Sequence, residues 1–400
     1  MSLKIKFMDF IARPYPGISS LVFTLSMIFS ANFATAAAAI IPRAPDIAAT
    51  SYILLDAKTG HVIIEENADE ALPPASLTKI MTAYIAVEEL LSGNLSLSDE
   101  VHISEKAWRM EGSKMFVGVD TNVRVDDLLR GIIVQSGNDA SVAIAEHIAG
   151  SEEAFADMMN QYSEVLGMDA SFFMNASGLD TEEYYNTMSA RDLATLATAS
   201  INRHAEYYPI YAEREFTYNE IRQSNRNTLL FRDRNVDGMK TGWTDAAGYC
   251  LVASAERDGM RLITVVMGTE SEDARAIQTQ KLLTYGFRYF ETHKLYDANQ
   301  VLTNVPVYSG AQNAVDLGIS EEVYITIPRG QAEAMTATVD VDEIIRAPLD
   351  KSQIMGVVSV VLDNNILYQG DVIAMQKIER GGVFKRFIDW LSLFFSDLFA

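Results

Sequence analysis

The sequence predicts an α+β protein with two folded domains, because its hydrophobic pattern changes character once along the chain. Residues 51–290 mix apolar-periodic helical segments with strand-like runs. Residues 291–382 carry short alternating runs separated by turn residues, which is typical of an all-β module. With 48% hydrophobic and 22% charged residues the composition is globular, and 400 residues are enough for two cores.

Residues 1–39 are expected to form a signal peptide that is removed on export. Lys4, Lys6 and Arg13 give a basic start, residues 14–42 carry no charge, and a run of small residues ends the segment at 34–39. The uncharged run is also long enough to span a membrane, so an uncleaved anchor is the alternative. The Ser, Thr and Asn residues that dilute its apolar middle favour cleavage.

The first domain, expected over 40–290, opens with a β-hairpin in which two apolar strands flank the turn at 56–60. Apolar periodicity then predicts helices, and β-rich runs predict two later strands. The helices are expected at 77–91, 125–134, 140–149, 152–166, 190–200 and 274–290, and the strands at 249–254 and 262–268.

The second domain, expected over 291–382, is predicted to consist of strands alone. They are expected at 305–308, 323–327, 337–341, 357–362 and 371–375. Two glycines, Gly381 and Gly382, then separate this domain from the C-terminal segment.

Residues 383–400 predict an amphipathic helix that lies in a membrane interface. Lys385, Asp389, Ser392 and Ser396 fall on one helical stripe, and aromatic and aliphatic side chains cover the remainder. The four charges of the segment cancel one another and disfavour a full span. The alternative is a terminal helix docked on the protein's own core.

The overall charge excludes some classes of partner. Lys+Arg number 32 and Asp+Glu 54, so the formal net charge is −22. This argues against a nucleic-acid-binding protein and against simple electrostatic docking on anionic lipid. The single cysteine, Cys250, excludes an intramolecular disulfide, and export without disulfides fits a bacterial periplasm. The five histidines show no zinc-ligand spacing, so no metal or cofactor is expected.

Ser76-Leu-Thr-Lys79 is the first motif that can carry chemistry, and it opens an apolar-periodic helix after two prolines. The spacing i, i+3 places the serine hydroxyl and the lysine amine on one helical face. A serine becomes a good nucleophile only when a base takes its proton, and a lysine can do this only when its pKa falls from about 10.4 towards neutrality. The alternative is an N-cap serine beside a surface lysine.

Two further motifs each occur twice, and position distinguishes the copies. Lys58-Thr-Gly60 sits at the predicted hairpin tip, and Ser92-Gly-Asn94 follows a helix end where glycine fits the C-cap. Ser136-Gly-Asn138 instead interrupts two helical stretches, and Lys240-Thr-Gly242 precedes the predicted strand pair. The second copies are therefore the candidates for a functional site.

Together the three motifs resemble those of the penicillin-interacting serine enzymes, whose signature is S-x-x-K, S-D-N and K-T-G. Longer strings resemble the low-molecular-mass penicillin-binding proteins that act as serine-type D-alanyl-D-alanine carboxypeptidases. They are Pro74-Ala-Ser-Leu-Thr-Lys79, Gln135-Ser-Gly-Asn-Asp-Ala140, Ala190-Arg-Asp-Leu-Ala194, Asn235-Val-Asp-Gly-Met-Lys-Thr-Gly242 and Ile327-Pro-Arg-Gly330. The resemblance covers nearly all of the mature chain. It implies an antiparallel sheet flanked by helices, followed by a small β-sandwich.

The resemblance implies a catalytic set made of Ser76, Lys79, Ser136, Asn138 and Lys240. Ser76 would attack the carbonyl of the penultimate D-alanine of a peptidoglycan stem pentapeptide, and Lys79 would take its proton. Lys240 and Ser136 would form a proton and charge relay with Lys79, and Lys240 would help to lower the pKa of Lys79. Asn138 would hold Lys79 or the substrate amide by hydrogen bonding.

The resemblance also implies a substrate-binding set made of Thr241, Gly242, Trp243, Arg275 and Arg226. The backbone N–H groups of Ser76 and Trp243 would form the oxyanion hole, and Thr241 would bind the terminal carboxylate. Arg275 resembles the family's carboxylate-directed arginine and Arg226 is a second candidate, although either fits a surface or structural role equally well. Trp243 departs from the family, where a smaller polar residue usually follows Lys-Thr-Gly, and a packing role is the alternative.

Two other functions stay open at this point. A class A β-lactamase shares the three motifs, and Glu182 would be its deacylating residue, although a loop glutamate is the simpler interpretation. A penicillin-binding sensor or scaffold without activity is the second. The favoured interpretation implies β-lactams as covalent inhibitors, no cofactor, and a location on the periplasmic face of the bacterial cytoplasmic membrane, with residues 383–400 on the membrane surface.

Overall fold

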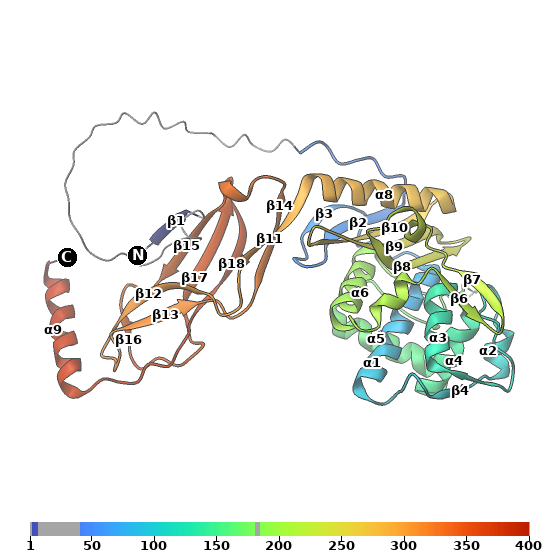
Figure 1. Ribbon diagram of the computed structural model, residues 1–400, viewed down its shortest axis with the longest axis horizontal. Coiled ribbons are helices and arrows are strands. Elements are labelled where there is room, and N and C mark those ends of the chain that lie inside the picture. The colour runs from blue at the N-terminus through green and yellow to red at the C-terminus, as the bar shows by residue number, and fades with distance from the viewer. Residues whose placement is uncertain (1, 7–40, 181–184, 400) are drawn as a thin grey trace. The chain divides into compact units, whose positions relative to one another are not determined.

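The computed structural model describes residues 2–6, 41–180 and 185–399, and these form two compact units (Figure 1). One unit is Pro42–Tyr289, and the other contains Phe290–Ala400 with the described N-terminal strand. The predicted signal peptide falls almost entirely on residues outside the described ranges. The predicted α+β class is confirmed, because the first unit mixes helices and strands and the second is built mainly of β-strands.

A five-stranded antiparallel sheet organises the first unit. Its order is β3-β2-β10-β9-β8, so that β8, which carries the Lys-Thr-Gly motif, lies at one edge. The strands are β2 (Ser51–Asp56), β3 (Val62–Glu66), β8 (Val236–Thr244), β9 (Gly248–Arg257) and β10 (Met260–Thr269). As predicted, β2 and β3 form a hairpin, and Gly60 in its turn has a φ of +71°.

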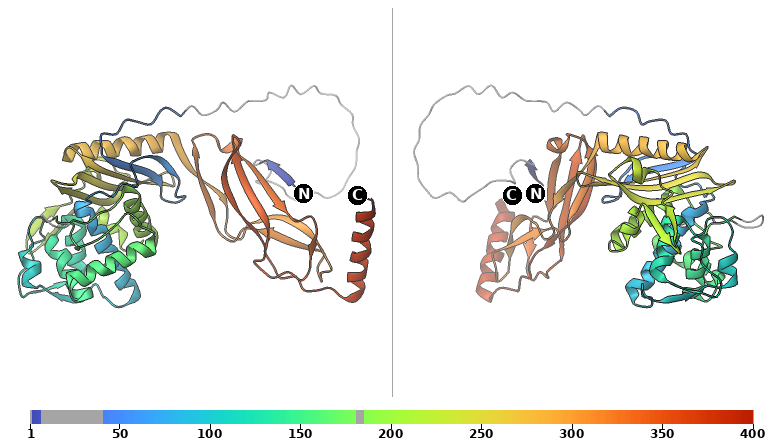
Figure 2. Two further views of the ribbon diagram at one scale, coloured as in Figure 1. Left: turned by 180° about the vertical axis from the view of Figure 1, so that it is seen from behind. Right: turned by 45° about the vertical axis from the view of Figure 1, so that its right-hand side comes forward.

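Helices cover both faces of this sheet (Figures 1 and 2). Helix α8 packs on one face against β9 and β10, and α6 packs on the other with the remaining helices beyond it. The long helices are α1 (Lys79–Ser92), α4 (Asn138–Ala149), α5 (Glu152–Leu166), α6 (Ala190–Arg203) and α8 (Glu272–Tyr289). Residues 79–87 of α1 are all buried, which makes it the central helix of the unit.

Short elements complete the first unit and most of them were not predicted. The helix predicted at 125–134 is divided into α3 (Val125–Arg130) and a π-helical turn at Gly131–Gln135. The turn ends because Ser136 takes a left-handed conformation with a φ of +67°. The other short elements are α2 (Glu105–Arg109), α7 (Leu229–Arg232), β4 (Glu100–His102), β5 (Asn122–Arg124), β6 (Glu215–Tyr218), β7 (Ile221–Ser224) and the 3₁₀ helices Ala75–Thr78 and Tyr208–Ala212.

The second unit is built on a seven-stranded sheet with the order β1-β15-β17-β18-β13-β12-β16, beside a separate β11–β14 pair. Apolar residues alternate along β17, where Val358, Val360 and Leu362 are buried in the core. The strands are β1 (Ser2–Lys6), β11 (Phe290–Tyr296), β12 (Val301–Tyr308), β13 (Ala314–Gly318), β14 (Val323–Pro328), β15 (Thr336–Val341), β16 (Ile345–Arg346), β17 (Ile354–Leu362) and β18 (Asn365–Ala374).

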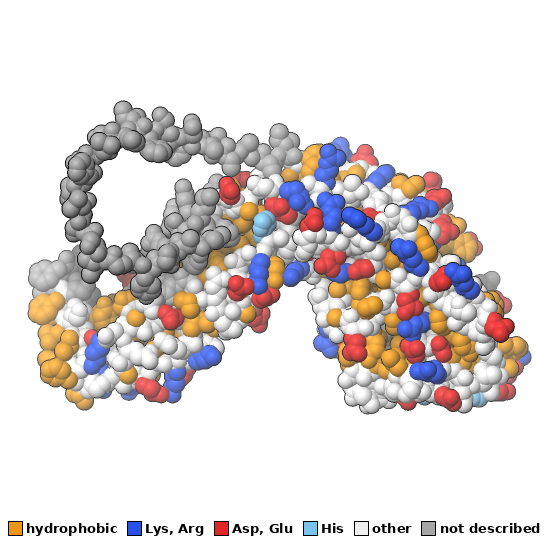
Figure 3. All heavy atoms as spheres, viewed as in Figure 1, with side chains coloured by type: hydrophobic (Ala, Val, Ile, Leu, Met, Phe, Trp, Pro, Cys, Tyr) orange, Lys and Arg blue, Asp and Glu red, His pale blue; other side chains and the backbone are white. Residues whose placement is uncertain are grey.

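Helix α9 (Val383–Phe399) contacts this unit through Asp389, and hydrophobic side chains are exposed along the helix (Figure 3). The Asp389 carboxylate accepts hydrogen bonds from the backbone N–H of Ser309 at 2.6 Å and from Lys385 at 2.7 Å, and Asp389 is only 7% exposed. Phe384 and Trp390 are 78% and 58% exposed. Within residues 2–6, 41–180 and 185–399, no helix is both long enough and apolar enough to cross a bilayer.

Candidate active site

Ser76 and Lys79 meet at the start of the central helix, as their spacing predicts. Ser76 lies in the 3₁₀ turn Ala75–Thr78, and α1 begins directly at Lys79. The Lys79 Nζ atom lies 3.0 Å from Ser76 Oγ. Lys79 is 1% exposed, so that the surface-lysine alternative is wrong.

The surroundings of Lys79 suit a base that gives and takes one proton. Besides Ser76 Oγ, its Nζ contacts Asn138 Oδ1 at 2.7 Å and the Ser177 carbonyl at 2.5 Å. Both of these partners are acceptors. A neutral amine has two N–H donors and one lone pair. When the two donors serve Asn138 and Ser177, the lone pair is left facing the Ser76 hydroxyl.

Burial and neighbouring charge favour the neutral form of this amine. Burial, followed by the charge of the Arg226 guanidinium, lowers the pKa of Lys79 to about 7, whereas the Asp139 and Glu152 carboxylates act in the opposite direction. A base whose pKa lies near neutrality can both take and return a proton at pH 7. No carboxylate contacts the Lys79 amine directly among the described residues.

Lys240 joins this centre from the edge strand β8. Its Nζ donates to Ser136 Oγ at 2.8 Å and to the Thr241 carbonyl at 3.1 Å. Lys240 is 2% exposed, and burial, followed by the charges of Lys79, Arg226 and Arg275, holds its pKa well below the usual value. Lys240 and Ser136 are 104 residues apart in sequence and are brought together here by folding.

The Ser-Gly-Asn motif occupies the break between two helical segments. Asn138 donates its Nδ2 to the Glu111 carbonyl at 2.6 Å, which orients its Oδ1 towards Lys79. An added Cβ at Gly137 would lie 2.8 Å from Asp139 Oδ1 and 3.1 Å from the Met115 backbone nitrogen. The larger aspartate of the Ser-Asp-Asn form therefore has no room at this position.

A cavity of about 210 Å³ opens beside Ser76 and is lined by polar and cationic side chains. Its lining residues are Ser76, Ser113, Ser136, Arg226, Thr241, Gly242, Trp243, Tyr249, Glu272 and Arg275. All five predicted substrate-binding residues are among them. The cavity is close to Ser76 because β8 approaches the 3₁₀ turn, where a Cβ at Gly242 would lie 2.7 Å from the Pro74 carbonyl oxygen.

Trp243 forms part of the cavity wall and is 51% exposed, so that it is not a core-packing residue. Its indole packs on Tyr249 with the ring centroids 5.8 Å apart, and the Arg275 guanidinium lies over the Tyr249 ring at 5.6 Å. Arg275 also donates to the Gly242 carbonyl at 3.2 Å and pairs with Glu272 at 3.1 Å. Arg226 donates to the Gln135 carbonyl at 3.2 Å on another side of the cavity.

The turn at 174–179 is the main functional segment that the sequence pattern missed. It contributes the Ser177 carbonyl, and a backbone acceptor leaves no mark in a side-chain motif. Gly178 has a φ of +72°, and a Cβ there would lie 1.9 Å from the Ala75 carbonyl oxygen. The Asn-x-x-Gly spacing of this turn is the signal that could have identified it. Glu182, the residue of the β-lactamase alternative, lies outside the described residues.

Two family models match the chain. One, described as D-alanyl-D-alanine carboxypeptidase, matches residues 28–271, and one, described as the C-terminal domain of penicillin-binding protein 5, matches residues 290–380. The chain is 42% identical over 368 residues to D-alanyl-D-alanine carboxypeptidase DacA of Escherichia coli strain K12, covering 90% of this chain and 91% of that protein. It is 37% identical over 340 residues to DacF of Bacillus subtilis strain 168, covering 84% and 87%.

Solved structures agree with these matches. Penicillin-binding protein 5 of Haemophilus influenzae is similar with a TM-score of 0.81 and 41% identity, over 85% of this chain and 100% of that one. Penicillin-binding protein D2 of Listeria monocytogenes in its ampicillin-bound form has a TM-score of 0.57 and 29% identity, over 62% of this chain and 100% of that one. The Listeria structure therefore matches only part of this chain, about as many residues as its first domain contains.

Proposed function

This chain belongs to the D-alanyl-D-alanine carboxypeptidase family, and from this premise we propose that Ser76 and Lys79 carry out its reaction. The predicted family and enzyme class are thereby confirmed. The observation that carries the assignment of residues is the buried Lys79 amine, 3.0 Å from Ser76 Oγ, with acceptors at its other two contacts. With this arrangement the protein removes the terminal D-alanine of a stem pentapeptide in two half-reactions.

In the first half-reaction Ser76 is acylated. Neutral Lys79 takes the hydroxyl proton as Ser76 Oγ bonds to the carbonyl carbon of the penultimate D-alanine. The negative oxygen that develops is stabilised by the backbone N–H groups of Ser76 and Trp243. The C–N bond then breaks, and the leaving amine takes a proton through Lys79 and the Ser136 hydroxyl. Free D-alanine departs and an ester on Ser76 remains.

In the second half-reaction water cleaves this ester. Lys79, neutral again after it has given up its proton, takes a proton from the attacking water as its oxygen bonds to the ester carbon. Lys79 then returns this proton to Ser76 Oγ as the ester bond breaks, and the peptide leaves as a carboxylic acid. Lys240 keeps a hydrogen-bond donor against the Ser136 hydroxyl throughout. The Ser76 hydroxyl and the neutral Lys79 amine are thus restored.

The cavity suits a substrate that ends in a carboxylate. Thr241 offers a hydroxyl, and Arg226 and Arg275 are the two guanidinium groups in the lining. Glu272 offsets part of the charge of Arg275, whose guanidinium is also held by the Gly242 carbonyl and Tyr249. The Arg275 guanidinium, held in this way, orients the carboxylate of the substrate, and Arg226 adds a second positive charge to the cavity lining.

β-Lactams are expected to acylate the same serine. The Listeria relative has been solved with ampicillin bound. A β-lactam presents a reactive amide beside a carboxylate, which matches the Ser76 and Thr241 ends of this cavity. The adduct would be an ester on Ser76 of the same kind as the peptide intermediate.

We also propose that the mature protein is exported and that α9 rests on the outer surface of the cytoplasmic membrane. The support is the exposure of the aromatic side chains of α9, while Asp389 on its polar side is bonded to Ser309 and the helix lies beside β12. Such a face gains free energy on transfer into a lipid interface. The charges of the segment cancel, so that attachment depends on apolar burial.

The proposed reaction is tested by incubating the protein with a pentapeptide that ends in D-Ala-D-Ala. Release of one D-alanine per peptide, with formation of the tetrapeptide, supports the carboxypeptidase assignment. Hydrolysis of penicillin without any D-alanine release would support the β-lactamase interpretation instead. The absence of both, with stable penicillin labelling, would point to the sensor.

A further inference from the structure

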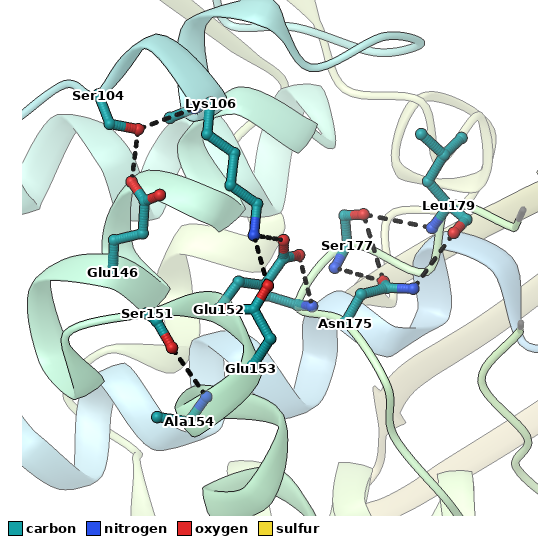
Figure 4. Close-up of polar contacts among 12 residues, drawn as sticks. Ser104, Lys106, Glu146, Ser151, Glu152, Glu153, Ala154, Asn175, Ser177 and Leu179 are labelled. Carbon is teal, nitrogen blue, oxygen red and sulfur yellow. Dashed lines mark hydrogen bonds and ion pairs between the residues drawn. The ribbon is translucent and has the colours of Figure 1, made fainter.

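The turn whose Ser177 carbonyl contacts Lys79 is supported by the buried carboxylate of Glu152. Figure 4 shows Glu152 beside Asn175 and Ser177 of this turn. Glu152 Oε1 accepts a hydrogen bond from the Ala176 backbone N–H at 3.1 Å. Asn175 completes the turn, because its Oδ1 accepts from the backbone N–H groups of Ser177 at 3.1 Å and Gly178 at 2.7 Å. The position of the Ser177 carbonyl is therefore set by side chains that do not line the cavity.

Glu152 and its neighbour Glu153 both pair with Lys106, but only Glu152 also bonds to the turn. Both carboxylates pair with Lys106 of α2, at 3.0 Å and 2.9 Å. The Glu152 side chain is 9% exposed and reaches the turn, whereas the Glu153 side chain is 76% exposed and lies on the surface. Both residues are in the first turn of α5, where the helix N-terminus stabilises negative charge.

We propose that Glu152 is a positioning residue for Lys79, which holds the Ser177 carbonyl against the amine and supplies a buried negative charge that Lys106 offsets. The proposal rests on the role of Lys79 as base, proposed above. The carbonyl accepts one Lys79 hydrogen at 2.5 Å, and this contact helps to direct the remaining nitrogen orbital to Ser76. If the turn shifted, the Lys79 amine would lose this contact, and its lone pair would no longer be held towards the Ser76 hydroxyl.

The charges that face these groups come from several elements. Lys79 is faced by Asp139 of α4, Glu152 of α5, Lys240 of β8 and Arg226 of the segment after β7. Glu152 and Asp139 raise the pKa of Lys79, whereas Arg226 lowers it. Glu152 in turn is faced by Lys106 of α2. Removing the charge of Glu152 therefore lowers the pKa of Lys79, and removing the charge of Lys106 raises it.

The test compares pH profiles of acylation in matched variants of the full protein. The rate constant for labelling by a fluorescent penicillin is measured between about pH 5 and pH 9 for wild type, Glu152→Gln, Lys106→Met and Glu153→Gln. The amide introduced by Glu152→Gln keeps an oxygen that can accept from Ala176, so the substitution removes charge and retains the turn. Glu153→Gln also neutralises a carboxylate that pairs with Lys106, but the Glu153 side chain does not reach the turn.

The acid limb of each profile is the fall in acylation rate at low pH, where Lys79 becomes protonated. We expect Glu152→Gln and Lys106→Met to shift this limb in opposite directions. Glu152→Gln moves its midpoint to lower pH by roughly 0.5 to 1 unit, Lys106→Met moves it to higher pH, and Glu153→Gln leaves it within about 0.2 unit of wild type. The double variant Glu152→Gln/Lys106→Met returns close to wild type. A second substitution, Glu152→Ala, also removes the hydrogen bond, and it lowers the plateau rate about tenfold or more where Glu152→Gln does not.

The proposal is overturned if the midpoint for Glu152→Gln coincides with that for Glu153→Gln, or if Glu152→Ala and Glu152→Gln reach the same plateau. Either result would leave D-alanine release by the wild type intact, so the proposed function would stand. Acylation that persists in Lys79→Ala would instead refute the role of Lys79 and the proposed function with it. A thermal unfolding midpoint for each variant separates loss of the fold from loss of positioning.

Discussion

At the scale of single residues, the proposed mechanism rests on Lys79, because its position favours the neutral amine. Lys79 begins a helix whose first turns are fully buried, and desolvation is the largest influence on its pKa. Its two acceptor partners come from distant segments, Asn138 of α4 and the carbonyl of Ser177. A solvent-exposed lysine at the same spacing from a serine would keep its proton at pH 7.

The influence of Arg226 on this lysine can be measured directly. Because its guanidinium lowers the pKa of Lys79, Arg226→Gln should raise that pKa and move the acid limb of the acylation rate to higher pH by about half a unit. The matched control is Arg222→Gln, since Arg222 is exposed and pairs with Glu215 on the β6–β7 hairpin. The midpoint pH of penicillin labelling is the quantity to compare. A midpoint for Arg226→Gln equal to that of the control would contradict the electrostatic account.

Much of this centre was predictable from residue types, and the reason is that its chemistry needs side chains at fixed spacing. Ser76, Lys79, Ser136 and Lys240 lie in short motifs, and the structure brings them together. The Ser177 carbonyl and the Glu152 support were not predictable in this way. One is a backbone group, and the other is a glutamate whose importance depends on its burial rather than on its sequence neighbours.

At the scale of elements, the site depends on close approaches between segments that allow no side chain. The turn at 174–179 lies against the 3₁₀ turn that carries Ser76, and Gly178 marks the contact. The edge strand β8 approaches the same 3₁₀ turn at Gly242. The two glycines thus let the turn and the strand reach the nucleophile from different directions.

Substitution of Gly178 tests this packing. Gly178→Ala should destabilise the protein by about 1 kcal/mol through its left-handed backbone, and by about 1–3 kcal/mol more because the new Cβ meets the Ala75 carbonyl. Gly167→Ala is the control, since Gly167 has a similar φ of +69° and an added Cβ there meets nothing within 4 Å. Chemical denaturation gives both free energies of unfolding. Equal losses in the two variants would show that the close approach has no energetic weight.

Prediction of the elements succeeded where a pattern was long. The helices α1, α5 and α8 have more than three turns of apolar periodicity, and the sequence located each of them. The strands β11 and β13 and the small hairpin β6–β7 were missed, because a few residues of alternation are not distinctive. The π-helical turn before Ser136 was also missed, since a left-handed serine depends on its surroundings rather than on local propensity.

At the scale of the whole molecule, charge and apolar surface are distributed unevenly. The chain carries a formal net charge of −22, yet its cavity is lined by two arginines with Lys79 and Lys240 buried beside it. The global charge argued against a nucleic-acid partner, but it did not describe the site. Exposed aromatic side chains gather on α9, which contacts the β-sheet unit through Asp389.

Removal of residues 383–400 tests the proposed membrane role of α9. The truncated mature protein should move from the membrane fraction to the soluble fraction, because the exposed aromatic face is lost. Its rate of D-alanine release from a soluble pentapeptide should remain within about twofold of the full protein, since the site lies wholly in Pro42–Tyr289. Fractionation of cells followed by penicillin labelling locates the protein, and an assay of D-alanine release gives the rate. Truncated protein that stays with the membrane would refute the anchor.

The central claim is that one acyl-enzyme on Ser76 lies behind both peptide cleavage and penicillin binding. It is tested most directly by comparing wild type with Ser76→Ala for D-alanine release and for the mass of the penicillin adduct. We predict that Ser76→Ala lowers D-alanine release by at least about 1,000-fold and shows no added mass, whereas the wild type carries one adduct that maps to Ser76. A penicillin adduct retained by a folded Ser76→Ala protein, or release at the wild-type rate, would place the nucleophile elsewhere.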